Sequence, residues 1–580
     1  MDKIKSDLLQ VVNKNSLLNY ISELKFSDKD SHAELYKWLI VLHNNGTLDV
    51  ISAFNELKND KSHEFFLIRN IFEKILPEIK SPMLDVMECV LHLVKEAGHD
   101  MAFGAIFTPY IDFCLADSSR IKQALVLIEK STHKFSDLLT PTIVAGSRID
   151  TELYIKKAIQ LVNHENIEIK KRAIFSLGRI VYLENRLLLD LALSTLETSV
   201  EQESDEALIT SLIQSAFSLY KQNKLLEERV SILIDIALLK CGEQAIHTAS
   251  HIFGYDFKEL SEPLLDMFLL NLQRTNPVNK ATLDNIDYGL EKLLETETPE
   301  KGIEFIETIL TTNTAALSIE VFDGVSRGLL KNDNGILNRL MTRWFIRGEK
   351  ALCTAIHDIV SQAQKQNIVL SVEPNELTSK NITNIAFIAR KAVGYLFMRP
   401  VSATSIIISL ISYANDDEVA KVLTDLLFDP LLLNFSGAVK PYLLKNQTEN
   451  ENNLVKTACK ESIDSFEKYL NNLKSTGNIP ELYPSQSQRE AYNRYFSRQM
   501  SVSMKEAESK SVFSSLVSKS VILYGGKSIN YYYNGNEKPQ RTELTLQNHS
   551  TSMEFPRSQI INPFGLDYML RVYRAEQIKT

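Results

Sequence analysis

The sequence is poor in the residues that build turns, disulfides and membrane spans. Its 580 residues include 20 Gly, 16 Pro, five Cys and two Trp. So little Gly and Pro excludes collagen-like and linker-like chains and argues against a turn-rich all-β protein. No stretch approaches the ~18 consecutive apolar residues of a membrane span, and the richest one, residues 405–411, is interrupted by serine. We therefore expect no contact with a membrane.

The cysteines are scattered and odd in number, and none belongs to a Cys-x-x-Cys pair. They are Cys89, Cys114, Cys241, Cys353 and Cys459. A disulfide framework or a structural zinc site needs clustered cysteines. The amino-terminal stretch also lacks the uninterrupted apolar core of a signal peptide. We interpret the thiols as buried and reduced, and we expect a cytoplasmic protein.

Helical periodicity is what the chain has in abundance. Up to about residue 475, segments of roughly 12–20 residues carry apolar side chains at three- and four-residue spacing, between short polar breaks. In residues 82–97, for example, Met83, Val86, Met87 and Val90 fall on one helical face. Strand-like alternation is almost absent there, so these helices have to bury their apolar faces against one another. This pattern predicts an α-solenoid of two-helix units of roughly 40 residues over residues 1–475, and an irregular all-α globule is the alternative.

One stretch carries a repeat signature. Residues 151–182 read TELYIKKAIQLVNHENIEIKKRAIFSLGRIVY, and their second half resembles the second helix of a HEAT repeat at Arg172, Ala173 and Gly178. In that family the arginine ties neighbouring turns together, and the small residues let adjacent helices approach closely. The aspartate usual in the preceding turn is replaced by the Asn-His-Glu-Asn of residues 163–166. The resemblance implies a HEAT-like α-α superhelix of the kind that organises multi-subunit assemblies.

The pattern changes after about residue 475. A polar stretch, residues 476–488, predicts a linker, and residues 489–580 predict a small α+β module. Within this module we expect a polar helix from residue 489 to about 512, strands in 520–526, 529–533 and 542–546, and a final helix over 565–577. Residues 501–580 carry ten Lys and Arg and seven Asp and Glu, which gives this part a net charge of +3. Because the whole chain has a net charge of −9, residues 1–500 have a net charge of −12.

The candidate catalytic motifs in the sequence are incomplete, and the one candidate metal site has an unfavourable spacing. A phosphate-binding loop at Gly526-Lys527-Ser528 needs a second glycine where Val521 stands, and no Gly-x-Ser-x-Gly elbow is present. We therefore predict neither an enzyme nor a cofactor. Glu243, His247 and His251 share one helical face and are plausible zinc ligands. Because their spacing covers two helical turns, we instead expect a polar or interface histidine pair and no metal.

Aromatic and arginine side chains are the types that anchor interfaces. Our candidates for interaction are Trp344, Arg343, Arg347, Tyr531, Tyr532, Tyr533, Lys527, Arg541, Arg557 and Arg571. For Trp344, core packing is the competing role. The apolar and arginine-rich end of the chain is expected to pack down, against the last repeats as a cap or against a partner.

These patterns predict a non-catalytic interaction scaffold that binds a protein partner through an extended helical-repeat surface, as a subunit of a larger assembly. The main alternative is a nucleic-acid-associated protein that uses the repeat surface, with its basic residues at 156–157 and 170–172, and the Tyr/Lys-rich C-terminal module. The negative charge of residues 1–500 opposes the phosphate neutralisation that such binding needs. A third possibility is an enzyme whose chemistry lies in the C-terminal module.

Overall fold

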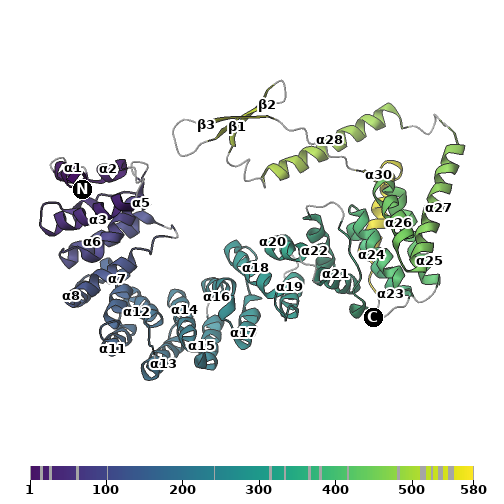
Figure 1. The fold of residues 1–580 in the computed structure, drawn as a ribbon. Coiled ribbons are helices and arrows are strands. Elements are labelled where there is room, and N and C mark those ends of the chain that lie inside the picture. The colour runs from purple at the N-terminus through teal and green to yellow at the C-terminus, as the bar shows by residue number, and fades with distance from the viewer. Residues whose placement is uncertain are drawn as a thin grey trace. The chain divides into compact units, whose positions relative to one another are not determined.

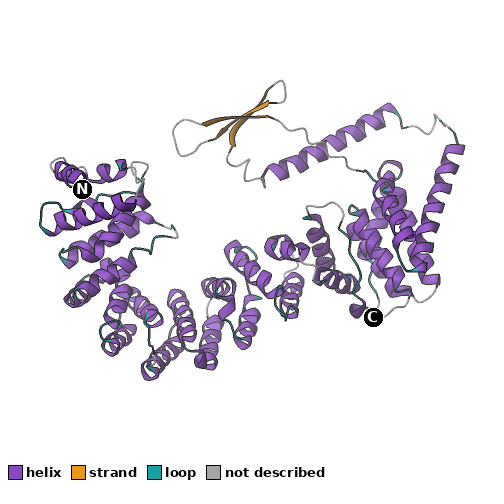
Figure 2. Cartoon of the chain, viewed as in Figure 1, coloured by secondary structure: helices purple, strands orange, loops and turns teal. Residues whose placement is uncertain are grey.

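The protein is mainly helical, as the sequence predicts (Figures 1 and 2). The computed structural model describes residues 2–12, 17–24, 29–60, 64–98, 100, 102–183, 185–240, 242–312, 317–331, 335–363, 368–377, 382–414, 417–477, 479, 484–509, 517–523, 527–532, 540–545 and 554–578. Among these residues, no helix combines the length and the apolar character needed to cross a membrane.

The chain divides into two compact units, residues Met1–Gly328 and Leu329–Thr580. The predicted boundaries at residues 475 and 488 stay a prediction. The helices of unit 1 are α1 (Asp2–Val12), α2 (Leu17–Glu23), α3 (Lys29–Asn44), α4 (Val50–Phe54), α5 (Phe65–Ile75), α6 (Met83–Ala97), α7 (Phe107–Ala116), α8 (Ser118–Lys130), α9 (Thr132–Phe135), α10 (Leu139–Ser147), α11 (Thr151–Val162), α12 (Ile167–Arg179), α13 (Arg186–Gln202), α14 (Glu206–Gln222), α15 (Glu227–Lys240), α16 (Glu243–Tyr255), α17 (Glu262–Leu272), α18 (Lys280–Leu294), α19 (Glu300–Thr312) and α20 (Asp323–Lys331), in which the division falls.

Short polar side chains start several of these helices. Asp150 accepts a hydrogen bond from the Leu153 amide at 2.9 Å, and Asp205 accepts from the amides of Ala207 and Leu208. Such a cap satisfies amides that have no partner inside the helix. Helices α11 and α14 begin at Thr151 and Glu206, directly after these two aspartates.

Helices of unit 1 pack on helices two positions away in the chain, and so form two rows. Helices α11, α13, α15 and α17 contact one another in that order and form the first-helix row. Helices α10, α12, α14, α16 and α18 form the second-helix row in the same way. Figure 1 shows these helices following one another in chain order. Each helix therefore buries its apolar face against the helix pairs before and after it.

Glycines allow close approach within the second-helix row. A Cβ at Gly178 on α12 would lie 2.6 Å from the Cα of Ser215 on α14, and a Cβ at Gly254 on α16 would lie 2.7 Å from the Asn285 carbonyl oxygen on α18. Atoms cannot approach so closely, and both neighbours are backbone. These two helix contacts therefore require glycine.

Unit 2 contains the remaining helices and a small sheet. Its helices are α21 (Ile336–Arg347), α22 (Lys350–Ser361), α23 (Ile382–Leu396), α24 (Pro400–Ser412), α25 (Asp417–Leu426), α26 (Ser436–Glu449), α27 (Asn453–Ser475), α28 (Gln486–Ser509), α30 (Arg557–Ile561) and α31 (Pro563–Ala575). The three described strands are β1 (Val517–Leu523), β2 (Lys527–Tyr532) and β3 (Gln540–Thr545). They form one antiparallel sheet in the order β1-β2-β3, with Val521 opposite Ile529 and Asn530 opposite Thr542.

The described cysteines behave as the sequence predicts. Cys89, Cys114, Cys353 and Cys459 are buried and free, whereas Cys241 lies outside the described residues. Burial raises the pKa of the Cys114, Cys353 and Cys459 thiols to about 12. A thiol with so high a pKa is protonated at neutral pH and is therefore a poor nucleophile.

Candidate interaction surfaces

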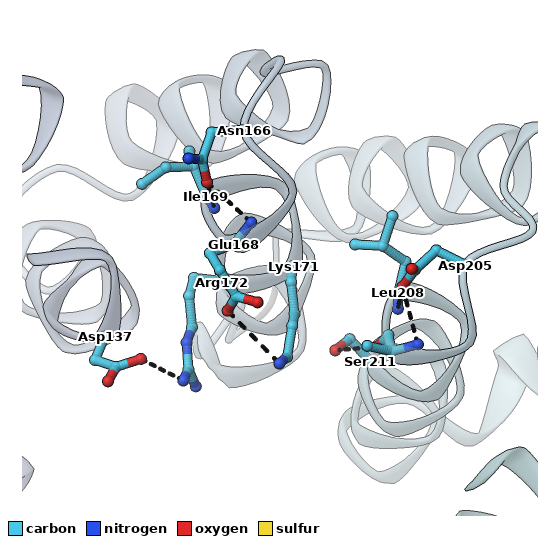
Figure 3. Close-up of polar contacts among 10 residues, drawn as sticks. Asp137, Asn166, Glu168, Ile169, Lys171, Arg172, Asp205, Leu208 and Ser211 are labelled. Atoms are coloured by element: carbon cyan, nitrogen blue, oxygen red, sulfur yellow. Dashed lines mark hydrogen bonds and ion pairs between the residues drawn. The ribbon is translucent and has the colours of Figure 1, made fainter. Parts of the chain in front are cut away.

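Charged side chains connect successive helix pairs of unit 1. Arg172 on α12 forms an ion pair with Asp137, 35 positions earlier, and Lys170 bonds Glu203, 33 positions later, at 2.6 Å. Figure 3 shows the Arg172 guanidinium extended towards Asp137 and away from its own helix. The separation in sequence corresponds to about one helix pair.

The same kind of bond recurs further along the unit. Lys301 on α19 contacts Glu262 and Asp266 on α17 at 2.8 and 2.7 Å. These two hydrogen-bonded carboxylates raise the pKa of Lys301. Arg229 on α15 bonds Glu197 on α13, and this contact raises the pKa of the guanidinium. Both cations are therefore committed to neighbouring helix pairs.

The basic side chains that support the nucleic-acid alternative also have carboxylate partners. Lys156 and Lys157 contact Glu152 and Glu129 at 2.5 and 2.8 Å, and Lys171 lies 3.6 Å from Glu168. With the pairs of Lys170 and Arg172, five basic side chains of residues 156–172 contact carboxylates. Phosphate binding here would have to displace them.

The first-helix row exposes large aliphatic side chains on consecutive helices. We call these six residues the aliphatic row: Leu153 on α11, Leu187 and Leu191 on α13, Ile232 and Leu239 on α15, and Leu270 on α17. Leu187 keeps 85% of its surface exposed. Single exposed apolar side chains are ordinary, but several of them on helices that pack together are more typical of an interaction surface.

The predicted metal candidates lie on α16 and make other contacts. His247 Nδ1 lies 3.0 Å from the Thr282 hydroxyl, and burial lowers the pKa of His247. The His251 ring stacks on Tyr255 with centroids 4.7 Å apart, and Glu243 accepts from the Asn276 amide group. Across the described ranges, no three His, Cys, Asp or Glu side chains gather in a metal-binding geometry.

A small cavity of about 140 Å³ lies beside these residues, between α16 and α18. Glu243, Asn276, Arg274 and Thr282 line it, and Arg274 donates to the Leu238 carbonyl at 3.0 Å. Ligand pockets usually hold about 300–1,000 Å³. Since the cavity is small and its polar groups bond to protein atoms, we assign it no ligand.

The predicted candidates on α21 have partners inside unit 2. Trp344 is completely buried. Arg343 forms a two-pronged contact with Glu376, at 3.1 Å from Nε and 2.8 Å from Nη2, and Arg347 bonds Glu349 at 2.7 Å. Trp344 is therefore a core side chain.

The end of the chain packs on unit 2 at two places. Glu554 accepts hydrogen bonds from the amides of Gly437 and Ala438 in the first turn of α26, at 2.7 and 3.0 Å. Helix α31 packs on α23, where Glu576 contacts Arg390 at 2.7 and 2.6 Å. We call these two contacts, together with those of Lys391 and Arg574 described next, the C-terminal anchor.

Lys391 on α23 is the most unusual member of the C-terminal anchor. Its side chain is completely buried, and its ammonium group donates to the Arg574 carbonyl at 2.6 Å. Burial lowers the pKa of Lys391. Arg574 in turn donates to the Gly394 carbonyl at 2.6 Å, and a Cβ at Gly394 would lie 3.1 Å from that of Tyr573. The anchor therefore combines close packing with charge-assisted hydrogen bonds.

The remaining predicted candidates lie in the sheet and at the end of the chain. Arg541 is exposed on β3, 3.9 Å from Glu543, and Tyr531 is half-buried on β2. The backbones of Lys527 and Tyr532 belong to β2, whereas Tyr533 lies outside the described residues. Arg557 lies over the Tyr469 ring, and Arg571 pairs with Asp567 on α31.

Sequence reasoning predicted that the end of the chain packs down but not which residues of the C-terminal anchor do so, and it missed the aliphatic row. Single exposed leucines on helices look like core positions in a sequence, and Glu554 carries no local motif. We find no protein-family model that matches the chain, and no curated protein is similar to it in sequence.

Proposed function

We propose that this chain is a non-catalytic cytoplasmic scaffold that binds a protein partner through an extended helical-repeat surface and is a subunit of a larger assembly. In this proposal its helix pairs form a HEAT-like α-solenoid, and a small C-terminal α+β module follows. The regular contacts between helices two positions apart support this architecture, as does the close approach at Gly178. Stacked repeats bind partners on extended surfaces.

The observation that carries the proposal is the aliphatic row. Its six side chains belong to α11, α13, α15 and α17, alternate helices of the chain that contact one another in this order. A partner that covers them removes their exposed apolar surface from water, which stabilises the complex by about 25 cal/mol per Å². Aliphatic side chains offer nothing to a phosphate backbone, so this surface favours a protein partner.

The ion pairs of unit 1 support the same choice. Arg172, Lys170 and Lys301 each contact a carboxylate on a neighbouring helix pair. Nucleic-acid binding depends on basic side chains that are available to neutralise phosphates. Duplex binding that weakens steeply with salt would instead support the nucleic-acid alternative.

The test compares two double variants of the full chain in affinity capture from the native lysate. Leu187→Asp with Leu239→Asp places two charges in the aliphatic row. Leu225→Asp with Val278→Asp places the same charges on side chains that are equally exposed but lie in connecting segments.

We expect one protein to copurify in constant ratio with the wild type and the control pair, and to be lost at least ~10-fold from the first pair, because charges inside an interface are strongly unfavourable. Retention of the same partner by both pairs would contradict the proposal. So would a catalytic activity that survives in a chain lacking the partner.

A further inference from the structure

The last two helices expose an apolar strip of their own. We call it the C-terminal strip: Ile560 and Ile561 on α30, and Phe564, Tyr568 and Val572 on α31. Phe564 keeps 87% and Tyr568 72% of its surface exposed. Residues at i, i+4 and i+8 share one helix face, so Phe564, Tyr568 and Val572 form a continuous line along α31.

Contacts with other helices of unit 2 hold the C-terminal strip in place. Glu576 binds Arg390, the Arg574 carbonyl accepts from Lys391, and Glu554 binds the first turn of α26. The opposite side of α31 is thus fixed to α23 by the C-terminal anchor. A rigid helix loses little conformational entropy when it binds, so the strip is preorganised for association.

Charges beside the strip indicate what binds it. Asp567 and Arg571 lie at i, i+4 on α31, 2.8 Å apart, and both are exposed. If a second α31 packs antiparallel on the first, the two-fold axis places each aspartate near the arginine of the other copy. The surface is therefore complementary in charge to itself, which is what a two-fold symmetric interface requires.

We propose that the C-terminal strip is the interface of a homodimer in which α31 packs antiparallel on α31 of a second copy. Phe564 packs against Val572 of the second copy, Tyr568 lies near the axis, and Asp567 and Arg571 exchange partners between copies. This interface lies on unit 2, apart from the aliphatic row, so it does not depend on the proposed scaffold function.

The first test measures the mass of the full chain by light scattering from about 1 to 100 μM, the range in which weak dimers form. We expect the wild type to change from one chain to two as concentration rises. Phe564→Arg should raise the midpoint ~10-fold or more. Leu225→Arg, an equally exposed side chain on unit 1, should leave it unchanged.

The second test uses charge exchange, which keeps the strip's apolar residues. Asp567→Arg and Arg571→Asp should each weaken self-association, because like charges meet across the axis. Mixing the two variants should produce a heterodimer near wild-type affinity, since both opposite-charge contacts return. This rescue is not expected if the substitutions merely damage the fold.

Several results would overturn the homodimer. One is a single-chain mass at every concentration, and another is a dimer that Phe564→Arg leaves unchanged. A third is a charge-exchanged mixture that associates no better than either variant alone. If the chain stays monomeric while Phe564→Arg abolishes binding of a different protein, the strip belongs to that partner and the proposal is wrong.

Discussion

Units 1 and 2 differ in how far along the chain their side-chain bonds reach. In unit 1, bonds between helix pairs join residues such as Lys170 and Glu203, 33 positions apart. In unit 2, Gly437 bonds Glu554 across 117 positions, and Arg390 bonds Glu576 across 186. Unit 1 is assembled from neighbours, whereas the folding of unit 2 also depends on the end of the chain.

The difference has an energetic consequence. When each helix pair contacts only its neighbours, stability is close to a sum of local contributions. Contacts that join distant parts of a chain couple their stabilities instead. A destabilising substitution in unit 1 should therefore affect only helices near the altered residue. A destabilising substitution in unit 2 should also affect helices that are far away in the sequence.

The largest expected effect comes from Trp344→Ala in unit 2. Removing this completely buried side chain should lower the free energy of unfolding of unit 2 by about 3–5 kcal/mol, through lost packing and a cavity. Hydrogen exchange should quicken from α21 to α31 and stay unchanged in unit 1. Leu444→Ala, an exposed position on α26, is the control. Faster exchange confined to α21 would show that unit 2 is not coupled.

A smaller effect is expected from Gly178→Ala in unit 1. The new methyl group would lie 2.6 Å from the Ser215 Cα, so α12 and α14 have to separate, at a cost of about 1–3 kcal/mol. Exchange should quicken in α12, α14 and their direct neighbours, and stay unchanged from α18 onward.

The matched control for this substitution is Gly104→Ala. There the nearest atom to the added methyl group is 3.7 Å away, an ordinary contact. A loss of protection spread evenly over unit 1 would argue against local stabilisation.

The smallest effect is a pH dependence that Lys391 contributes to the C-terminal anchor. Because its pKa is lowered when buried, the folded state binds this proton more weakly than the unfolded state does. Stability should therefore rise with pH between the lowered pKa and the ordinary value near 10.5, by at most about 1.4 kcal/mol per pH unit.

Lys391→Met removes the titrating group and keeps most of the volume. The difference in α31 exchange protection between wild type and this variant, measured at several pH values, isolates the contribution of the lysine from those of all other titrating groups. An identical pH profile in the two proteins would mean that Lys391 does not titrate on release of the helix.

Local patterns in the sequence predict much of this structure. The stripe at Met83, Val86, Met87 and Val90 is buried on α6, and the strands fall within a few residues of the expected segments. These features depend on residues close together in the chain, where periodicity, caps and turn signals act. The type and position of these elements can therefore be predicted from the sequence.

The partners of charged residues cannot be predicted in the same way. Residues 163–166, just before α12, contain no aspartate, yet Arg172 forms an ion pair with Asp137, 35 positions earlier. Likewise, the sequence indicates that the chain's end packs down, but not that Glu554 completes the first turn of α26. Such contacts depend on how helices stack on one another. The spacing of apolar residues within one segment does not determine this stacking.

The position of Glu554 also affects the order of events during synthesis. A ribosome releases the chain from its amino terminus, and domains formed from adjacent segments fold as they emerge. Unit 1 is formed from adjacent segments, because each of its helix pairs contacts the pairs next to it in the sequence. The first amides of α26 receive their carboxylate acceptor only after another 117 residues have been translated, so this part of unit 2 cannot complete its contacts as soon as α26 emerges.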